Sequence, residues 1–428
     1  MNVLRRHPRD REIAALAIPA LATLAIDPLV SIVDTAWVGR LGTEPLAALA
    51  VASAVFAAAF SILGFVHLTV TPLVAGDVGR GDLPRAGAVA KGALVISAAI
   101  GVVVAAAAWV VADPLAVAIS SSEPVAVEAA SYLRVRFLSL PAMLLTMVGH
   151  GVYRGHSDTR TPLRVAVGLN VINLVLDPVL IFGLELGVTG AAWATVVAQG
   201  VAAVWFLHLL LVKDRERLGT HGRVRSVGSL PIAGILAAGW PLMIRSTALL
   251  AAITASTLVA AQIGTVEVAA HQIALQVWLF LSFVLDSFAV AAQPMVGTDL
   301  GRGDIDAARD IARRLLHLGF ATGVALSLLL AASAPFVAGI FSADSAVSAE
   351  LSRIYGFVVV LQPLTALVYV YDGIGIGASA FRFLAVSMVI AATATVAMLW
   401  LFGDDLVGVW SAVTVLTVSR LLSFAVWN

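Results

Sequence analysis

Residues 92–112 read GALVISAAIGVVVAAAAWVVA. No charged side chain interrupts this stretch, and its only hydroxyl side chain is Ser97. A helix of this length crosses the roughly 30 Å of hydrocarbon in a bilayer. A helix is also favoured there because it satisfies its own backbone hydrogen bonds. The stretch therefore predicts a membrane-spanning helix.

Similar apolar runs recur along the whole chain. Of its 428 residues 60% are hydrophobic and 12% are charged, and the mean hydropathy is +0.99. Soluble domains contain about 25% charged residues, so a soluble fold is excluded. The alternating ten-residue segments of an outer-membrane barrel are absent. With no cysteine, the chain has no disulfide and no thiolate chemistry.

The hydropathy pattern predicts an all-α polytopic membrane protein with twelve spans. Prolines inside several of them, such as Pro141 and Pro178, predict kinks. The expected spans lie near residues 11–38, 46–75, 88–112, 129–152, 162–184, 188–212, 230–259, 266–296, 310–340, 350–374, 382–402 and 406–427.

The loops between these spans differ in charge. Most of the 26 Lys and Arg residues lie in the N-terminal segment and in loops that follow even-numbered spans, whereas the other loops contain mainly acids. The positive-inside rule then predicts that both termini and the basic loops are cytoplasmic. We expect a protein integral to the plasma (cytoplasmic) membrane, with its first span retained rather than cleaved as a signal peptide.

The chain also contains an internal repeat. Residues 72–82, PLVAGDVGRGD, match residues 294–304, PMVGTDLGRGD, and Pro19 matches Pro241 at the same offset of 222 positions. This predicts two pseudo-symmetric six-helix lobes around a central cavity, an arrangement typical of transporters. The expected parts are an N-terminal lobe at 1–212, a cytoplasmic inter-lobe loop at 213–229 and a C-terminal lobe at 230–428.

Polar residues within the spans indicate a cation site in the first lobe. The predicted topology places Asp34, Asp177 and Thr195 at similar depths near the outer boundary, and Asn173 shares a helix face with Asp177. Charged residues in hydrocarbon are costly and usually functional. Carboxylate, amide and hydroxyl oxygens suit Na⁺, and two neighbouring carboxylates also suit a proton. Helix-to-helix hydrogen bonding is the structural alternative.

Several sequence motifs resemble those of the multidrug and toxic compound extrusion (MATE) family, and most closely those of its DinF-like branch. The motifs are Val33-Asp34-Thr35, Tyr153-Arg154-Gly155 with Asp158-Thr-Arg-Thr-Pro-Leu163, and Asn173-x-x-Leu-Asp177-Pro178. The resemblance implies secondary efflux by alternating access, in which an organic compound, cationic or amphiphilic, leaves as H⁺ or Na⁺ enters. It also implies that Asp34, Asn173, Asp177 and Thr195 form the cation site.

Other residues are candidates for the substrate cavity or a second acid site. The cavity candidates are Asp27, Trp37, Trp240, Arg245, Gln272, Gln276, Trp278 and Phe283. Asp372 is a weak candidate for a second acid, and Arg245 stands where another branch of the family has an acid in the seventh span. For most of the aromatic residues, packing is the commoner role.

Two other functions compete with efflux. A lipid-linked precursor flippase needs a cationic cavity, and deep basic residues are few. A prenyltransferase-type enzyme needs paired acidic motifs, which the spans lack, so we expect no enzyme. Lys91 and Lys213 lie outside any phosphate-loop motif, so ATP is not expected to drive transport. We expect small organic molecules and membrane lipid as partners, with no cofactor and no nucleic acid. Substrate, coupling ion and oligomeric state stay open.

Overall fold

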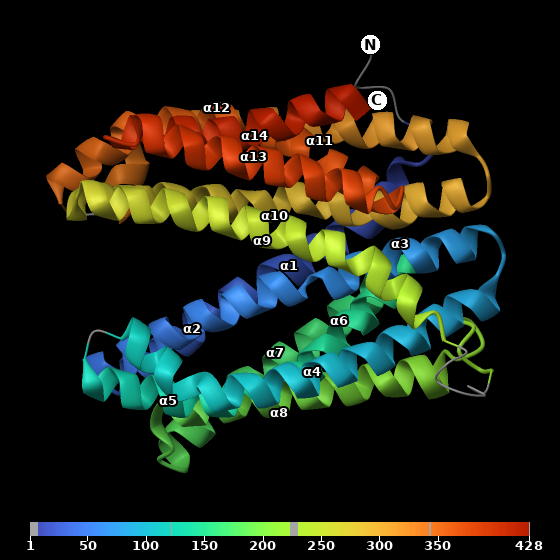
Figure 1. Cartoon of the computed structure of the whole chain (residues 1–428), viewed down its shortest axis with the longest axis horizontal. Helices are drawn as coiled ribbons and strands as arrows, with labels where there is room; N and C mark the ends of the chain where they lie inside the picture. Colours follow the sequence, from blue (N-terminus) through green and yellow to red (C-terminus); the bar gives the residue numbers. More distant parts are fainter. Residues whose placement is uncertain (1–6, 121, 223–229, 342–343, 428) are drawn as a thin grey trace. The chain divides into compact units, whose positions relative to one another are not determined.

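A computed structural model describes residues 7–120, 122–222, 230–341 and 344–427, and the regular elements in these ranges are helices. Figure 1 shows their course along the chain. The helices are α1 (Asp10–Gly39), α2 (Thr43–Leu63), α3 (Phe65–Gly79), α4 (Leu83–Ile119), α5 (Glu123–Phe137), α6 (Leu140–Gly155), α7 (Arg160–Pro178), the π-helix η1 (Val179–Gly183), α8 (Gly187–His208), the π-helix η2 (Leu209–Lys213), α9 (Ile232–Ile263), α10 (Thr265–Gly301), α11 (Ile305–Phe341), α12 (Ser345–Gly377), α13 (Phe381–Phe402) and α14 (Leu406–Trp427).

The predicted spans are confirmed by these helices. Within the described residues, 11 helices are long and apolar enough to cross a membrane, and the total is 12 if the bent pair α5 and α6 is one span. That pair bends by 49° where Pro141 occupies the first turn of α6. Proline suits a first helical turn because its missing N–H has no partner there anyway. Pro178 likewise ends α7, and η1 follows it directly.

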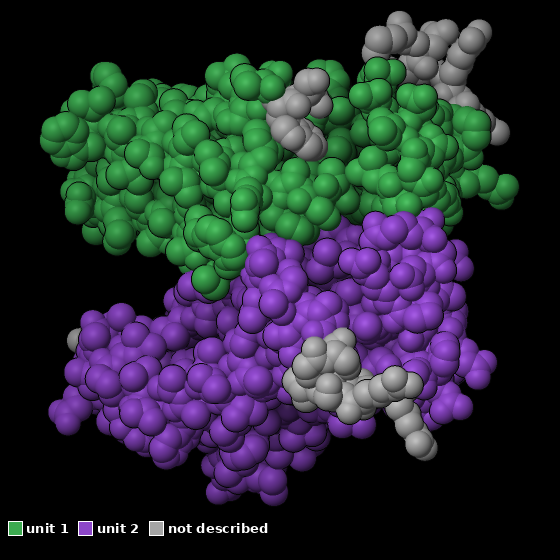
Figure 2. All heavy atoms as spheres, turned by 45° about the vertical axis from the view of Figure 1, so that its right-hand side comes forward, with its two compact units in different colours: residues 1–17, 240–428 green, residues 18–239 purple. Residues whose placement is uncertain are grey.

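The chain divides into two compact units, coloured separately in Figure 2. The N-unit is formed by residues 18–239, and the C-unit by the described residues of 1–17 and 240–428. Their boundaries differ from those expected for the lobes by 10 to 27 residues. The divisions fall inside α1, before Ile18, and inside α9, before Trp240. These two positions are equivalent under the 222-residue repeat. The expected inter-lobe loop at 213–229 is described only as far as residue 222.

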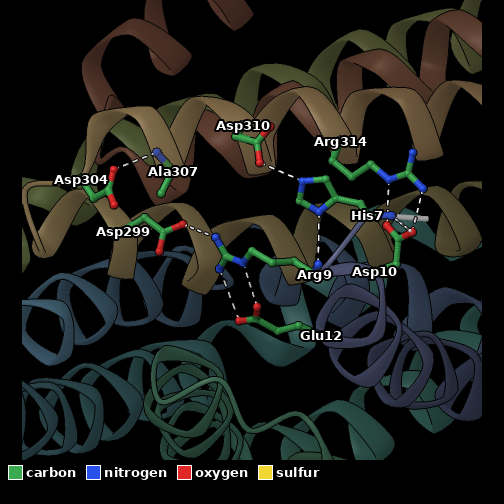
Figure 3. Close-up of polar contacts among 9 residues, drawn as sticks. All are labelled: His7, Arg9, Asp10, Glu12, Asp299, Asp304, Ala307, Asp310 and Arg314. Carbon is green, nitrogen blue, oxygen red and sulfur yellow. Dashed lines mark hydrogen bonds and ion pairs between the residues drawn. The ribbon is translucent and has the colours of Figure 1, made fainter. Parts of the chain in front are cut away.

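Polar contacts explain why the chain's first described residues belong to the C-unit (Figure 3). Arg9 Nη1 donates to Asp299 of α10 at 2.5 Å, and Asp10 accepts from Arg314 of α11 at 2.7 and 2.8 Å. His7 Nε2 lies 2.8 Å from Asp310 Oδ2, also on α11. Sequence order alone assigned this segment to the first lobe, whereas charge complementarity with α10 and α11 places it in the C-unit.

The repeated Gly-Arg-Gly-Asp motif builds the same turn in each unit. Gly81 and Gly303 have φ values of 76° and 77°, a region that glycine adopts without the usual steric cost. The following aspartates cap the next helix: Asp82 accepts from the Arg85 N–H at 3.0 Å, and Asp304 from the Ala307 N–H at 2.9 Å. The motif is therefore structural in both units.

Close glycine contacts pack the helices of the N-unit. A Cβ atom at Gly101 of α4 would lie 2.5 Å from Pro141 Cα of α6, and one at Gly155 of α6 would lie 2.7 Å from Val74 Cβ of α3. Small residues that allow close backbone approach are typical of membrane helix interfaces. This packing fixes the rotation of α3, α4 and α6 about their axes.

Candidate functional site

The four residues predicted as a cation site all lie in the N-unit. Asp34 is on α1, Asn173 and Asp177 are on α7, and Thr195 is on α8. Asn173 and Asp177 share a face because they are one helical turn apart. Since α7 packs directly on α8, Thr195 is brought beside that face.

The two carboxyl groups form the centre of the site. Asp177 is completely buried, and among the described residues no donor reaches either of its carboxylate oxygens. Asp34 faces it closely enough for one carboxyl, when protonated, to donate to the other, and the Asp34 Oδ1 atom is likewise buried without a donor. A buried carboxylate that lacks donors is expensive. Protonation or a bound cation can relieve this cost.

Asn173 and Thr195 make a separate hydrogen-bonded pair. Asn173 Nδ2 donates to Thr195 Oγ1 at 3.2 Å, and Thr195 Oγ1 donates to the Ala191 carbonyl at 3.0 Å. The hydroxyl oxygen thus already accepts one hydrogen bond. The sequence prediction grouped these residues with the acids as one set of ligands, whereas in the structure they divide into an acid pair and an amide–hydroxyl pair.

Residues that the sequence prediction did not single out surround the acid pair. Tyr132 and Arg136, one turn apart on α5, both interact electrostatically with Asp34. The Arg136 guanidinium carbon lies 3.6 Å from the centroid of the Phe56 ring. The signal for Arg136 was present, since an arginine within a predicted span is costly and usually functional.

Asp27, a cavity candidate, also lies in the N-unit but has a partner. Its Oδ1 accepts a hydrogen bond from Asn170 Nδ2 at 3.0 Å, and the same amide donates to the Ala166 carbonyl at 2.9 Å. The contact joins α1 to α7 about two turns from Asp34. Asp27 therefore helps to hold together the two helices that supply the acid pair.

In the C-unit, Asp372 forms ion pairs with two arginines. Its Oδ2 atom lies 2.5 Å from Arg245 of α9 and also bonds Arg420 of α14. All three side chains are about one-tenth exposed or less. Two arginines therefore balance the negative charge of Asp372, which makes it a poor second acid site. Arg245 is part of this ion-pair cluster. Arg420 is a second arginine that the sequence prediction missed.

The remaining cavity candidates lie in varied surroundings. Trp278 is 4% exposed within a hydrophobic core and donates to Thr365 Oγ1 at 3.4 Å, so its role in the C-unit is packing. Trp37, in the N-unit, contacts Phe182 edge-on at 6.1 Å. The others are accessible to different degrees: Trp240 and Gln276 are exposed, and Gln272 and Phe283 are half-buried.

The Asp158 motif that suggested a family resemblance starts a helix. Asp158 Oδ1 accepts from the N–H groups of Arg160 and Thr161 at 3.1 and 3.0 Å, so it satisfies the first two backbone donors of α7 from the residue before the N-cap, Thr159. Burial tends to raise the pKa of Asp158, but hydrogen bonds from Thr161 and Arg217 outweigh it and hold the pKa below its ordinary value. This motif therefore positions α7, the helix that carries Asp177.

The fold and the site together define a class of protein. Two units built from a repeat of membrane-spanning helices, one of them with a buried acid pair, describe a secondary transporter. The chain belongs to the MATE family, whose model (described as MatE) matches residues 19–179 and 241–401. These two matches are offset by the same 222 positions as the internal repeat.

Known proteins agree with this assignment. The chain is 33% identical to Protein DETOXIFICATION 44, chloroplastic, of Arabidopsis thaliana, over 97% of this chain and 81% of that protein. It is 27% identical to DNA damage-inducible protein F of Escherichia coli (strain K12), over 98% and 92%. A solved structure, described as an outward-facing conformation of a multidrug resistance MATE family transporter, matches with a TM-score of 0.89 at 22% identity, over 99% and 96%. This last likeness shows the shared fold.

Proposed function

We propose that this MATE transporter exports organic compounds, cationic or amphiphilic, in exchange for protons that enter through the Asp34–Asp177 pair. One observation supports this most strongly: Asp177 is fully buried and neither of its carboxylate oxygens receives a hydrogen bond from the described residues. Proteins similar to this chain include a probable multidrug resistance protein NorM from Deinococcus radiodurans, 28% identical over 74% of the chain.

A proton suits this geometry better than Na⁺. Sodium needs several converging oxygen ligands, and the Thr195 hydroxyl already binds Asn173 and the Ala191 carbonyl. A proton needs only the two facing carboxyl groups. Coupling follows if proton and substrate bind with different affinity to the outward-open and inward-open arrangements. The charge asymmetry of the loops supports a plasma-membrane location with both termini cytoplasmic.

The test is efflux of a fluorescent cationic dye from proteoliposomes under an imposed pH gradient or an imposed Na⁺ gradient. We expect the pH gradient to drive efflux through the wild type, and we expect Asp177→Asn to abolish it. The matched control is Asp113→Asn, because Asp113 is half-exposed and forms an ion pair with Arg134. Gradient-driven efflux by a folded Asp177→Asn variant would refute the assignment, and efflux driven by Na⁺ alone would replace the proton with sodium.

A further inference from the structure

Arg136 occupies an unusual place for a charged residue. It lies in the last turn of α5, within the bent span that α5 and α6 form. Its guanidinium bonds Ser139 Oγ and lies against the Phe56 ring, 3.6 Å from the centroid. Within the described part of the chain, Arg136 forms no ion pair, because no carboxylate oxygen lies within 4.0 Å of its guanidinium nitrogens. The hydroxyl and the aromatic ring that hold this arginine are both neutral, so its positive charge is not neutralised and acts on the groups around it.

The carboxyl group that this charge acts on is Asp34. The two residues interact electrostatically across the space between α5 and α1 without forming an ion pair. Asp34 in turn faces Asp177. In the described residues, the charged or titratable groups that face the acid pair are Tyr132 and Arg136, both from α5. With both acids ionised, the group of Asp34, Asp177 and Arg136 has a net charge of −1, and one proton makes it neutral.

We propose that Arg136 is a positioning residue for the coupling ion, a fixed positive charge that weakens the hold of the acid pair on its proton. This inference rests on the proposed proton-coupled function. A completely buried carboxyl pair with no donors would otherwise retain a proton strongly, and a transporter that cannot release its proton stops after one half-cycle. Arg136 stabilises the deprotonated pair by Coulomb attraction, which favours release of the proton.

Ser139 and Phe56 restrain the position of this charge. The Ser139 side chain is buried, and it donates to the Arg136 carbonyl at 2.7 Å while its oxygen accepts from the guanidinium. This ring of contacts holds the guanidinium near Asp34 but short of a direct ion pair. A direct pair would hold the site deprotonated and prevent it from accepting the next proton, so the intermediate distance suits a site that must bind and release in turn.

The test measures dye efflux as a function of pH for the wild type, Arg136→Gln and Arg136→Lys. We expect Arg136→Gln to move the midpoint of the pH profile to higher pH by about one unit, which is a tenfold tighter hold on the proton, and to lower the maximal rate. Arg136→Lys keeps the charge, so its midpoint should stay close to the wild-type value. Ser139→Ala keeps the charge but frees the guanidinium, and it should give a smaller shift.

The outcomes distinguish a failure of the role inferred for Arg136 from a failure of the proposed proton-coupled efflux. If a folded Arg136→Gln variant has the wild-type midpoint and only a lower rate, Arg136 has a structural role and this inference is overturned. If Arg136→Gln does not fold, an unshifted midpoint in a folded Ser139→Ala variant overturns it equally, as does a midpoint in Arg136→Lys that moves although the charge is kept. If the wild type itself shows no gradient-driven efflux, the proposed function fails instead.

Discussion

Removing the carboxylate of Asp372 should destabilise the C-unit far more than removing an exposed carboxylate. Asp372 is 8% exposed and is bound by Arg245 and Arg420, whose side chains are 11% and 8% exposed. The variant Asp372→Ala leaves two buried guanidinium groups without their shared partner and close to each other. Breaking a buried ion pair costs about 3–5 kcal/mol, because the remaining charge stays desolvated.

The matched control is Asp113→Ala, the same substitution in an exposed pair. Asp113 is 51% exposed and Arg134 is 44% exposed. Exposed pairs of this kind contribute about 0–1 kcal/mol. The assay is unfolding of the detergent-solubilised protein, followed by the fluorescence of its nine tryptophans. We expect a clearly lower melting temperature for Asp372→Ala and almost no change for Asp113→Ala.

A triple variant tests the physical reason. Replacing Arg245 with Met, Asp372 with Leu and Arg420 with Met removes all three charges and keeps similar volumes. Buried ionic clusters replaced in this way often keep or gain stability. We therefore expect the triple variant to melt near the wild-type temperature. Equal melting temperatures for Asp372→Ala and Asp113→Ala would refute the reasoning, as would a triple variant as unstable as Asp372→Ala.

Two further predictions concern the N-unit. Gly101→Ala should lower the stability by about 1–3 kcal/mol, because its Cβ would lie 2.5 Å from Pro141 Cα. Gly200→Ala is the control, because a Cβ there has no atom within 4 Å and should leave the stability unchanged. The melting temperatures of both variants test this. Burial and the nearby charge of Arg217 lower the pKa of His156 from 6.5 to about 4, so folding favours the neutral imidazole. The contribution of His156 to the stability of the folded protein is complete above about pH 6.5 and is lost as pH falls toward 4. His156→Gln should therefore flatten the loss of melting temperature between pH 6.5 and 4, and an unchanged slope would contradict this.

Local sequence features determined the membrane helices of this protein. A run such as residues 92–112 has no stable alternative to a helix in hydrocarbon, because each backbone group needs a partner within the segment. The repeat offset of 222 residues is also visible in the sequence, and the two family matches confirm it. The predicted kink at Pro141 is confirmed by the 49° bend between α5 and α6, and at Pro178 α7 ends and the π-helix η1 begins.

The sequence predicted the members of the candidate site, and the tertiary structure decided their partners. Spacing placed Asn173 and Asp177 on one face, but only the packing of α7 against α8 pairs Asn173 with Thr195 and leaves Asp177 facing Asp34. The approach of Arg136 to Asp34 likewise depends on the rotation of α5. These contacts join residues far apart in the chain, and hydropathy gives the length of a helix without the direction of each side chain.

The same reason explains the unit boundaries and the C-unit cluster. Asp372 and Arg245 were noticed as intramembrane charges, yet their pairing with Arg420 needs three helices in register. The first described residues belong to the C-unit because they form ion pairs with Asp299 and Arg314, which lie about 300 positions later in the chain. Hydrophobic length, a local property, was determined by the sequence itself, and the ion pairs between distant helices were decided by the tertiary structure.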